Sequence, residues 1–183
     1  AGVEAVNATG GTVVLGGANT YGGDTTVSAG TLRISGAAAT AGSGGSIVLG
    51  NRTLDIANGA TVANTVTVSD GATITSSTGG GTLGAGGTLN LGAGVGLTLS
   101  SAGGGTLNVA RVISDSNDDG ALAINGGIVA LQAANTHGGD TTVSAGTLRI
   151  DGGTAGDGRI LLNANTLDIV NAGSVAADVV AGN

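Results

Sequence analysis

Short stretches in which apolar and polar residues alternate recur along the whole chain. The clearest form is Thr, apolar, polar, apolar, and it begins at Thr31, Thr53, Thr88, Thr106, Thr147 and Thr166. Such alternation puts the apolar side chains on one face of a β-strand. Gly, Asn-Gly and Asp-Gly between the stretches predict tight turns, and no apolar run has the spacing of a helix. The pattern predicts an all-β protein built from short strands.

The spacing of these stretches indicates a solenoid. Successive starts are 22, 35, 18, 41 and 19 residues apart. Halving the two long gaps, where the less regular stretches 65–75 and 121–127 lie, gives one period of about 19 to 20 residues. Short strands at such a period are typical of coils that stack in parallel. We therefore predict a parallel β-helix of about nine coils, each about 4.8 Å from the next.

The alternation also predicts which side chains form the core and which face solvent. In the first stretch Leu32 and Ile34 point inward, while Arg33 points outward. The corresponding inward pairs are Leu54 and Ile56, Leu89 and Leu91, Leu107 and Val109, Leu148 and Ile150, and Leu167 and Ile169. If neighbouring coils stack in register, Arg33 lies beside Asp55 and Arg149 beside Asp168, which helps to fix the register.

A longer repeat covers much of the chain. Residues 19–34 and 135–150 agree at 15 of 16 positions, and 13–36 and 129–152 at 19 of 24. We interpret the chain as a single solenoid over 1–183 with a long repeat of about 115 residues, 13–128 and 129–183, cut from a longer array.

Composition supports a folded rod and excludes several classes of protein. The 183 residues include 39 glycines, no proline and no cysteine, with 40% hydrophobic and only 9% charged residues. Disordered chains carry more charge, and collagen needs glycine at every third position. The net charge of −7 argues against nucleic acid as a partner, and no apolar run is long enough to span a membrane.

The repeat resembles a known family. "LGGANTYGGDTTVSAGTLRISG", which begins at Leu15, is similar to the passenger-associated repeat of bacterial autotransporters, L-x-G-x-N-T-Y-x-G-x-T-x-V-x-x-G-T-L-x-(I/L). The second copy departs from this form at Gln132, Ala133 and His137. The resemblance implies a right-handed parallel β-helix exported to the surface of a Gram-negative cell. It implies a location and a shape but no particular activity.

Candidate catalytic residues are few. His137 is the one histidine of the chain and could act as a base for Ser144, but the same position of the first copy holds Tyr21. We therefore expect a tolerated surface position, no catalytic site and no cofactor. The alternative, a polysaccharide-active β-helix enzyme, requires converging carboxylates.

The acidic residues available to such an enzyme are scattered along the chain. Convergence would have to bring together residues such as Asp24, Asp55, Asp140 and Asp168. Wide separation of these four carboxylates would contradict the enzyme hypothesis.

Two further features leave alternatives open. Asp115, Asn117 and Asp119 match the start of a calcium loop, but glycine stands where an EF-hand needs its final glutamate. This leaves either a solvated turn or a weak calcium site, and we assign no metal site. Asn7 and Asn51 begin glycosylation sequons, which chance readily supplies in a chain rich in Asn and Thr.

The sequence thus predicts a non-catalytic passenger segment, extracellular or on the outer-membrane surface. We expect the segment to be a rigid stalk that adheres to a host or cell-surface ligand or associates with itself into fibres. No residue of the chain identifies the ligand.

Overall fold

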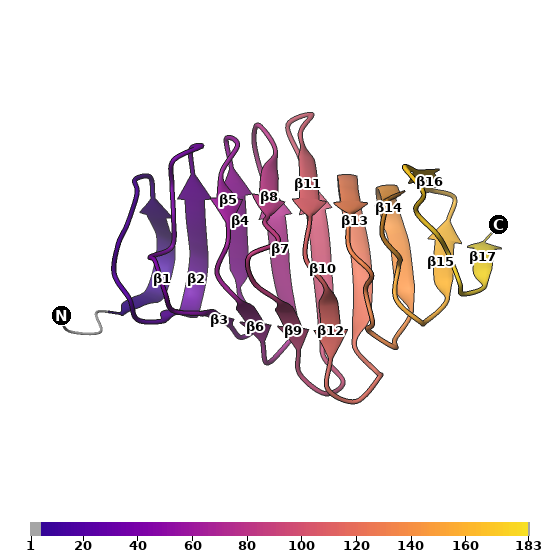
Figure 1. Cartoon of the computed structure of the whole chain (residues 1–183), viewed down its shortest axis with the longest axis horizontal. Helices are drawn as coiled ribbons and strands as arrows, with labels where there is room; N and C mark the ends of the chain where they lie inside the picture. Colours follow the sequence, from indigo (N-terminus) through magenta and orange to yellow (C-terminus); the bar gives the residue numbers. More distant parts are fainter. Residues whose placement is uncertain (1–4, 183) are drawn as a thin grey trace.

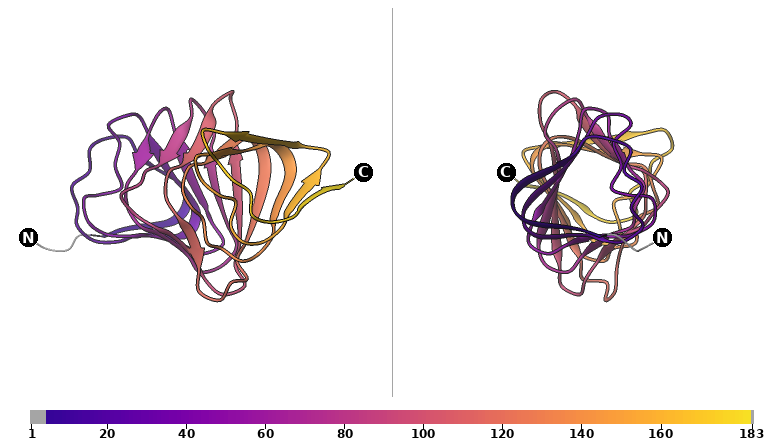
Figure 2. Two further views of the ribbon diagram at one scale, coloured as in Figure 1. Left: turned by 45° about the vertical axis from the view of Figure 1, so that its right-hand side comes forward. Right: turned by 90° about the vertical axis from the view of Figure 1, so that its left-hand side faces the viewer.

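The structure, a computed structural model that describes residues 5–182, is a β-solenoid of about nine turns. The 17 strands within residues 5–182 belong to one parallel sheet that winds around the long axis, and this part of the chain contains no helix (Figure 1). The end-on view shows successive turns lying over one another as a closed ring (Figure 2). The prediction of an all-β parallel solenoid is confirmed. The predicted extent 1–183 includes residues 1–4 and 183, which lie outside the described part.

The strands form three parallel stacks, named A, B and C, which run along the rod. Stack A contains residues 6–9 of β1 (Val6–Leu15), 25–27 of β2 (Thr25–Ser35), then β3 (Ile47–Leu49), β6 (Val66–Val68), β9 (Leu89–Leu91) and β12 (Ile113–Asp115). Stack B contains the second halves of β1 and β2, β4 (Thr53–Ala57), β7 (Ala72–Ser76), β10 (Gly96–Ser101), the first halves of β13 (Ala121–Leu131) and β14 (Thr141–Asp151), β15 (Ile160–Asn163) and β17 (Val179–Gly182). Stack C contains β5 (Thr61–Val62), β8 (Gly81–Leu83), β11 (Thr106–Val109), the second halves of β13 and β14, and β16 (Thr166–Val170).

Each stack contributes columns of aliphatic side chains to one continuous core. A column of stack B runs through Leu32, Leu54, Ile74, Leu99, Ile124 and Val143. All six side chains are at most 2% exposed. Complete burial of one such side chain is worth about 1.5–3 kcal/mol relative to an exposed one. The stacking of coils therefore supplies the stability that no single short coil could supply.

The length of a coil varies along the rod. The register advances by 19 residues from Val6 to Thr25 and again from Ile160 to Val179. It advances by 26 residues from Gly81 to Leu107, where longer turns project from the rod (Figure 1). The predicted length of about 19 to 20 residues therefore holds near both ends and between Ile47 and Val66, and several other coils are longer. Turns tolerate added residues because they leave the strand register unchanged.

The recurring four-residue pattern does not follow one stack. The stretches that begin at Thr31 and Thr53 lie in stack B, the one at Thr88 enters stack A, and those at Thr106, Thr147 and Thr166 lie in stack C. The idea that one period joins them all end to end is therefore wrong. The pattern reflects only the alternation of buried and exposed side chains along a strand, and this alternation is the same in every stack.

The two long repeats are rotated relative to each other by one stack. The column that begins at Leu32 reaches Val143, which corresponds to Val27 of the first copy, and does not reach Leu148. The offset of 116 residues between the copies therefore corresponds to five complete turns of the solenoid plus the step from stack B to stack C. Identical sequence consequently faces two different sides of the rod.

The predicted inward residues are buried, with two exceptions in the last coils. Ile169 is 49% exposed and Leu167 is only partly buried. Both belong to β16, and no described strand stacks on its outer side. The alternation is correct there, but burial also requires a following coil.

Candidate functional site

The longest strand pairs of the solenoid lie in the repeats. β1 pairs with β2, and β13 with β14, along almost their whole length, and each pair continues through a corner of the rod. A β-bulge at each corner sets two residues of one strand against a single glycine, Gly30 or Gly146, of the other. These glycines have φ of +77° and +86°, and a Cβ there would lie 2.1 and 2.3 Å from a carbonyl oxygen of the previous coil. The "VSAGTL" part of the motif thus forms a corner that only glycine fits.

The "NT" of the motif joins its coil to the next one. Asn135 donates through Nδ2 to the carbonyl of Thr154, whose hydroxyl donates back to the carbonyl of Asn135 at 3.0 Å. The first copy repeats both bonds between Asn19 and Thr40, each at 2.8 Å. Asn135 also accepts the backbone N–H of Ile113 at 2.8 Å. In both copies this asparagine adds side-chain hydrogen bonds to the backbone bonds between coils, at the point where the chain leaves a strand.

The position that distinguishes the two copies is an internal one. His137 is fully buried, and its Nε2 lies 3.1 Å from Oγ1 of Thr141. In the first copy the hydroxyl of Tyr21 lies 2.7 Å from Oγ1 of Thr25. The prediction of a tolerated surface position is therefore wrong for His137. The position accepts either ring because each one reaches the same threonine four residues later.

The geometry does not join His137 to its suggested nucleophile. Ser144 is exposed on the outside of β14, whereas the ring of His137 is inside the rod. Burial lowers the pKa of His137, and the nearby charges of Asp115 and Asp157 offset this effect only in part.

The predicted charge pairs form between neighbouring coils. Arg33 Nε lies 2.6 Å from Asp55, and Arg149 Nε lies 2.8 Å from Asp168. The register places the partners directly side by side in both pairs. Asp55 is only 2% exposed, and it also accepts the hydroxyl and the backbone N–H of Ser77 in the following coil. The stacking scheme deduced from the sequence is confirmed here.

The four carboxylates that the enzyme alternative needs have separate partners. Asp55 and Asp168 pair with arginines, Asp140 pairs with Arg159 at 2.7 Å, and Asp24 accepts the N–H of Ser46. The hydrogen bond and charge of Arg159 lower the pKa of Asp140. Among residues 5–182, no three His, Cys, Asp or Glu side chains lie close enough together to hold a metal ion.

Arg111 is a buried charged residue that the sequence did not single out. It is 2% exposed, and its guanidinium donates to four backbone carbonyls, of Val62, Asn64, Gly84 and Thr88. Those carbonyls belong to the two coils before its own, so the side chain joins three coils at the corner between stacks C and A. Burial lowers its pKa to about 10, which leaves it charged at neutral pH.

The acidic turn after β12 uses its carboxylates within the fold. Asp115 accepts the backbone N–H groups of Gly120 and Gly138, and Asp119 accepts the N–H of Gly94 at 2.7 Å. Burial raises the pKa of Asp115, but hydrogen bonds from neighbouring backbone amides outweigh it and lower the pKa overall. Asn117 is exposed beside them. These side chains therefore stabilise the turn, and weak calcium binding there stays an untested alternative.

Both glycosylation sequons begin at exposed asparagines. Asn7 lies on β1 and accepts the hydroxyl of Ser28 at 2.9 Å, and Asn51 lies in a bend before β4. Their exposure permits modification but gives no sign of it.

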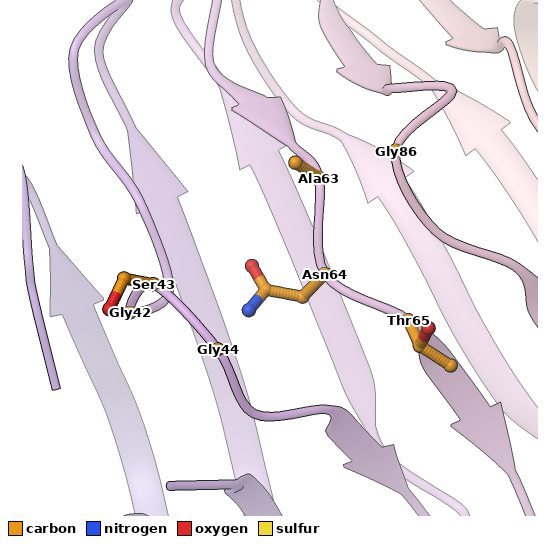
Figure 3. Close-up of a pocket in the computed structure, with 7 residues that line it drawn as sticks. All are labelled: Gly42, Ser43, Gly44, Ala63, Asn64, Thr65 and Gly86. Atoms are coloured by element: carbon orange, nitrogen blue, oxygen red, sulfur yellow. The ribbon is translucent and has the colours of Figure 1, made fainter. Parts of the chain in front are cut away.

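A shallow polar hollow of about 300 Å³ lies at the corner between stacks C and A, on the outside of the rod. It is lined by Gly42, Ser43, Gly44, Ala63, Asn64, Thr65 and Gly86 (Figure 3). The side chain of Asn64 projects across it toward the neighbouring coil, where its Nδ2 donates to the carbonyls of Ala41 and Gly45. None of the seven lining residues has an ionisable side chain, so the hollow lacks the groups that acid–base chemistry requires.

Comparison with known proteins identifies the repeat. The model of the passenger-associated-transport-repeat matches residues 10–34 and 124–150. Each matched segment begins in one long strand, goes once around the rod and finishes near the end of the next long strand. These two strands are β1 and β2 in the first copy and β13 and β14 in the second. No curated protein and no solved structure gives a significant match. The chain is thus a parallel β-solenoid with two segments that match the passenger-associated transport repeat, as the resemblance predicted.

Some of the residues that join coils carry no recognisable signal in the sequence. Arg111 stands in an ordinary alternating stretch, "NVARVISD", and nothing there marks it as internal. The partners Thr40 and Thr154 lie outside the recognised motif, but each begins the same short pattern, Thr-Ala-Gly-x-Gly, at 40–44 and 154–158. The doubled "NT" and the doubled "TAG" are informative, because the same residues in both copies suggest the same bonds.

Proposed function

We propose that the chain is a non-catalytic segment of an autotransporter passenger that extends from a bacterial cell as a rigid stalk. The passenger repeats imply secretion to the outer-membrane surface or beyond. The single observation that supports a stalk is the unbroken core, in which aliphatic columns pass through coil after coil without a break into domains. Residues 5–182 contain no helix that could cross a membrane.

The arrangement of polar groups favours contact along the surface over chemistry in a pocket. Outward-facing Thr, Ser, Asn and Asp side chains lie in rows along the stacks, and several of the aspartates pair with arginines or accept backbone N–H groups. Rows of this kind favour many weak contacts along the length of the rod, either with a cell-surface ligand or with another copy of the chain.

Electron microscopy of the purified protein tests the self-association part of this proposal. We expect short rods that join end to end or side by side into fibres as the concentration rises. Rods that stay separate at all concentrations would contradict self-association and leave adhesion to a surface ligand. Compact globular particles would contradict the stalk itself.

The alternative of a polysaccharide-active enzyme is tested separately by incubation with acidic and neutral polysaccharides. Release of reducing ends or of unsaturated sugars would overturn the non-catalytic proposal. A variant with Asp24, Asp55, Asp140 and Asp168 each changed to Asn would show whether those carboxylates are responsible.

A further inference from the structure

The surroundings of His137 differ from those of a histidine that is free to gain a proton. The hydroxyl of Thr141 donates to the carbonyl of Ala155 at 3.1 Å, so its oxygen lone pair is left to accept Nε2–H of the ring. That tautomer leaves Nδ1 as the atom that a second proton would occupy. Nδ1 is buried and has no hydrogen-bond partner among the described residues.

The next coil closes the space around Nδ1. The ring lies on Gly156, where an added Cβ would be only 2.5 Å from Cε1 and 2.7 Å from Nδ1. The backbone bond from Asp157 N–H to the carbonyl of His137, at 2.9 Å, holds this coil in place. A proton on Nδ1 would therefore lie at a buried contact between two coils, with no acceptor among residues 5–182 to receive it.

The charged groups that face the ring only partly compensate for this burial. Asp115 approaches from the preceding coil and Asp157 from the following one, and both favour the protonated ring. Asp118, in the preceding coil, presents its backbone to Gly138. Asp140, on the same segment as the ring, is paired with Arg159. Desolvation outweighs the carboxylates, so the folded state favours the neutral ring.

The first repeat contains the corresponding site with a tyrosine in place of the histidine. Tyr21 makes the same contact with the threonine four residues on, and its ring lies on Gly42 as that of His137 lies on Gly156. The same sixteen-residue stretch thus occurs in one chain with and without a group that takes up a proton in mild acid.

We propose that His137 is an acid-sensitive latch between two coils that keeps the segment of residues 132–160 closed at neutral pH and releases it in mild acid. In the unfolded or opened segment the histidine has its ordinary pKa of 6.5, whereas in the closed coil its pKa is lower. Below pH 6.5 the opened form binds a proton that the closed form excludes, so closure weakens as the pH falls and is unaffected above that value. The first repeat stays closed over the same range.

Two measurements on the wild-type protein test the latch. Because the chain has a single histidine, its ring resonances give the pKa of His137 directly, and we expect a value below 6.5. Hydrogen exchange, corrected for the intrinsic effect of pH, should show protection of 132–160 falling by up to about tenfold per pH unit below that point. Protection of 16–45, which contains Tyr21, should not change.

His137→Tyr is the matched variant because it installs the residue that the first repeat already uses. In this variant the protection of 132–160 should become independent of pH between about 7.5 and 5, since the tyrosine hydroxyl titrates only near pH 10. A histidine pKa at or above 6.5, or an equal loss of protection in both repeats, would overturn the proposal. A loss that persists in a folded His137→Tyr variant would also overturn it. If the variant does not fold, the wild-type titration and the comparison of the two repeats decide.

Discussion

At the scale of single residues, the two Arg–Asp pairs of the repeats show that identical residues can contribute differently to the stability of the fold. The pairs have the same chemistry and the same register, yet Asp55 is 2% exposed and Asp168 is 35% exposed. The difference arises from the next coil, where Ser77 covers Asp55 and donates two hydrogen bonds to it. An exposed pair contributes little to stability, whereas a buried carboxylate with several donors is costly to leave without them.

We therefore expect Asp55→Ala and Asp168→Ala to differ in stability although both remove the same ion pair. Loss of Asp55 leaves Arg33 and Ser77 without their acceptor and should cost about 1–3 kcal/mol. Loss of Asp168 should cost less than about 1 kcal/mol. Urea denaturation of both variants measures the difference, and equal destabilisation would contradict the role assigned to Ser77.

Arg111 provides a second prediction at this scale. Arg111→Met keeps an unbranched side chain but leaves four backbone carbonyls without their donor, so we expect a loss of about 3 kcal/mol or more. Arg111→Lys should recover only part of this stability. The planar guanidinium group of arginine donates in several directions at once, whereas the compact ammonium group of lysine cannot reach the carbonyls of both coils. Arg159→Ala, which removes an exposed arginine, is the control and should have a small effect. Stability of Arg111→Met equal to that of the control would show that the carbonyls find other donors.

At the scale of the element, the decisive feature is the corner within each long strand. β2 and β14 continue through a bend because one glycine with positive φ opposes two residues of the preceding strand. The same motif makes the corner between stacks A and B in the first copy and between B and C in the second. The corner is therefore a property of the local sequence and does not depend on which face of the rod it occupies.

Substitution of a corner glycine should break this element. Gly146→Ala places a Cβ 2.3 Å from the carbonyl of Gly127 at a φ of +86°, so strain and a steric clash act together. We expect a loss of several kcal/mol, beyond the roughly 1 kcal/mol that left-handed backbone alone costs an L-residue. Gly50→Ala, where nothing lies within 4 Å of an added Cβ, is the control and should be nearly neutral. Thermal unfolding by circular dichroism distinguishes the two, and a neutral Gly146→Ala would contradict the described bulge.

At the scale of the whole molecule, stability comes from contacts between neighbouring coils. Most strands pair with the coil before them and the coil after them, and within residues 5–182 no strand joins distant parts of the rod. Such a molecule behaves as a one-dimensional array in which each coil depends on its two neighbours. A defect in the middle should consequently weaken both sides, and a defect at an end should weaken one.

Leu99→Ala tests this dependence. Leu99 is fully buried between Ile74 and Ile124, and its truncation should cost about 2–5 kcal/mol. Hydrogen exchange should show lost protection in β7, β10 and β13 together. Leu162→Ala, in the partly buried column near the end, should cost less and affect only β14, β15 and β17. Uniform loss of protection along the rod in either variant would show global cooperativity and contradict the array.

The sequence by itself determined the local properties of this protein: strand alternation, parallel stacking, the Arg–Asp register and the repeat family. Each of these depends on residues close together in the chain or on a period of one coil, so a single sequence displays them. The tertiary structure alone decided which stack each repeat occupies, that His137 and Arg111 are internal, and that Asp55 is covered while Asp168 is not. These properties depend on which strands the intervening turns bring side by side, and turns of different lengths do so without any change in the local alternation. Burial in a solenoid is therefore set by the coils on either side, which the local pattern does not specify.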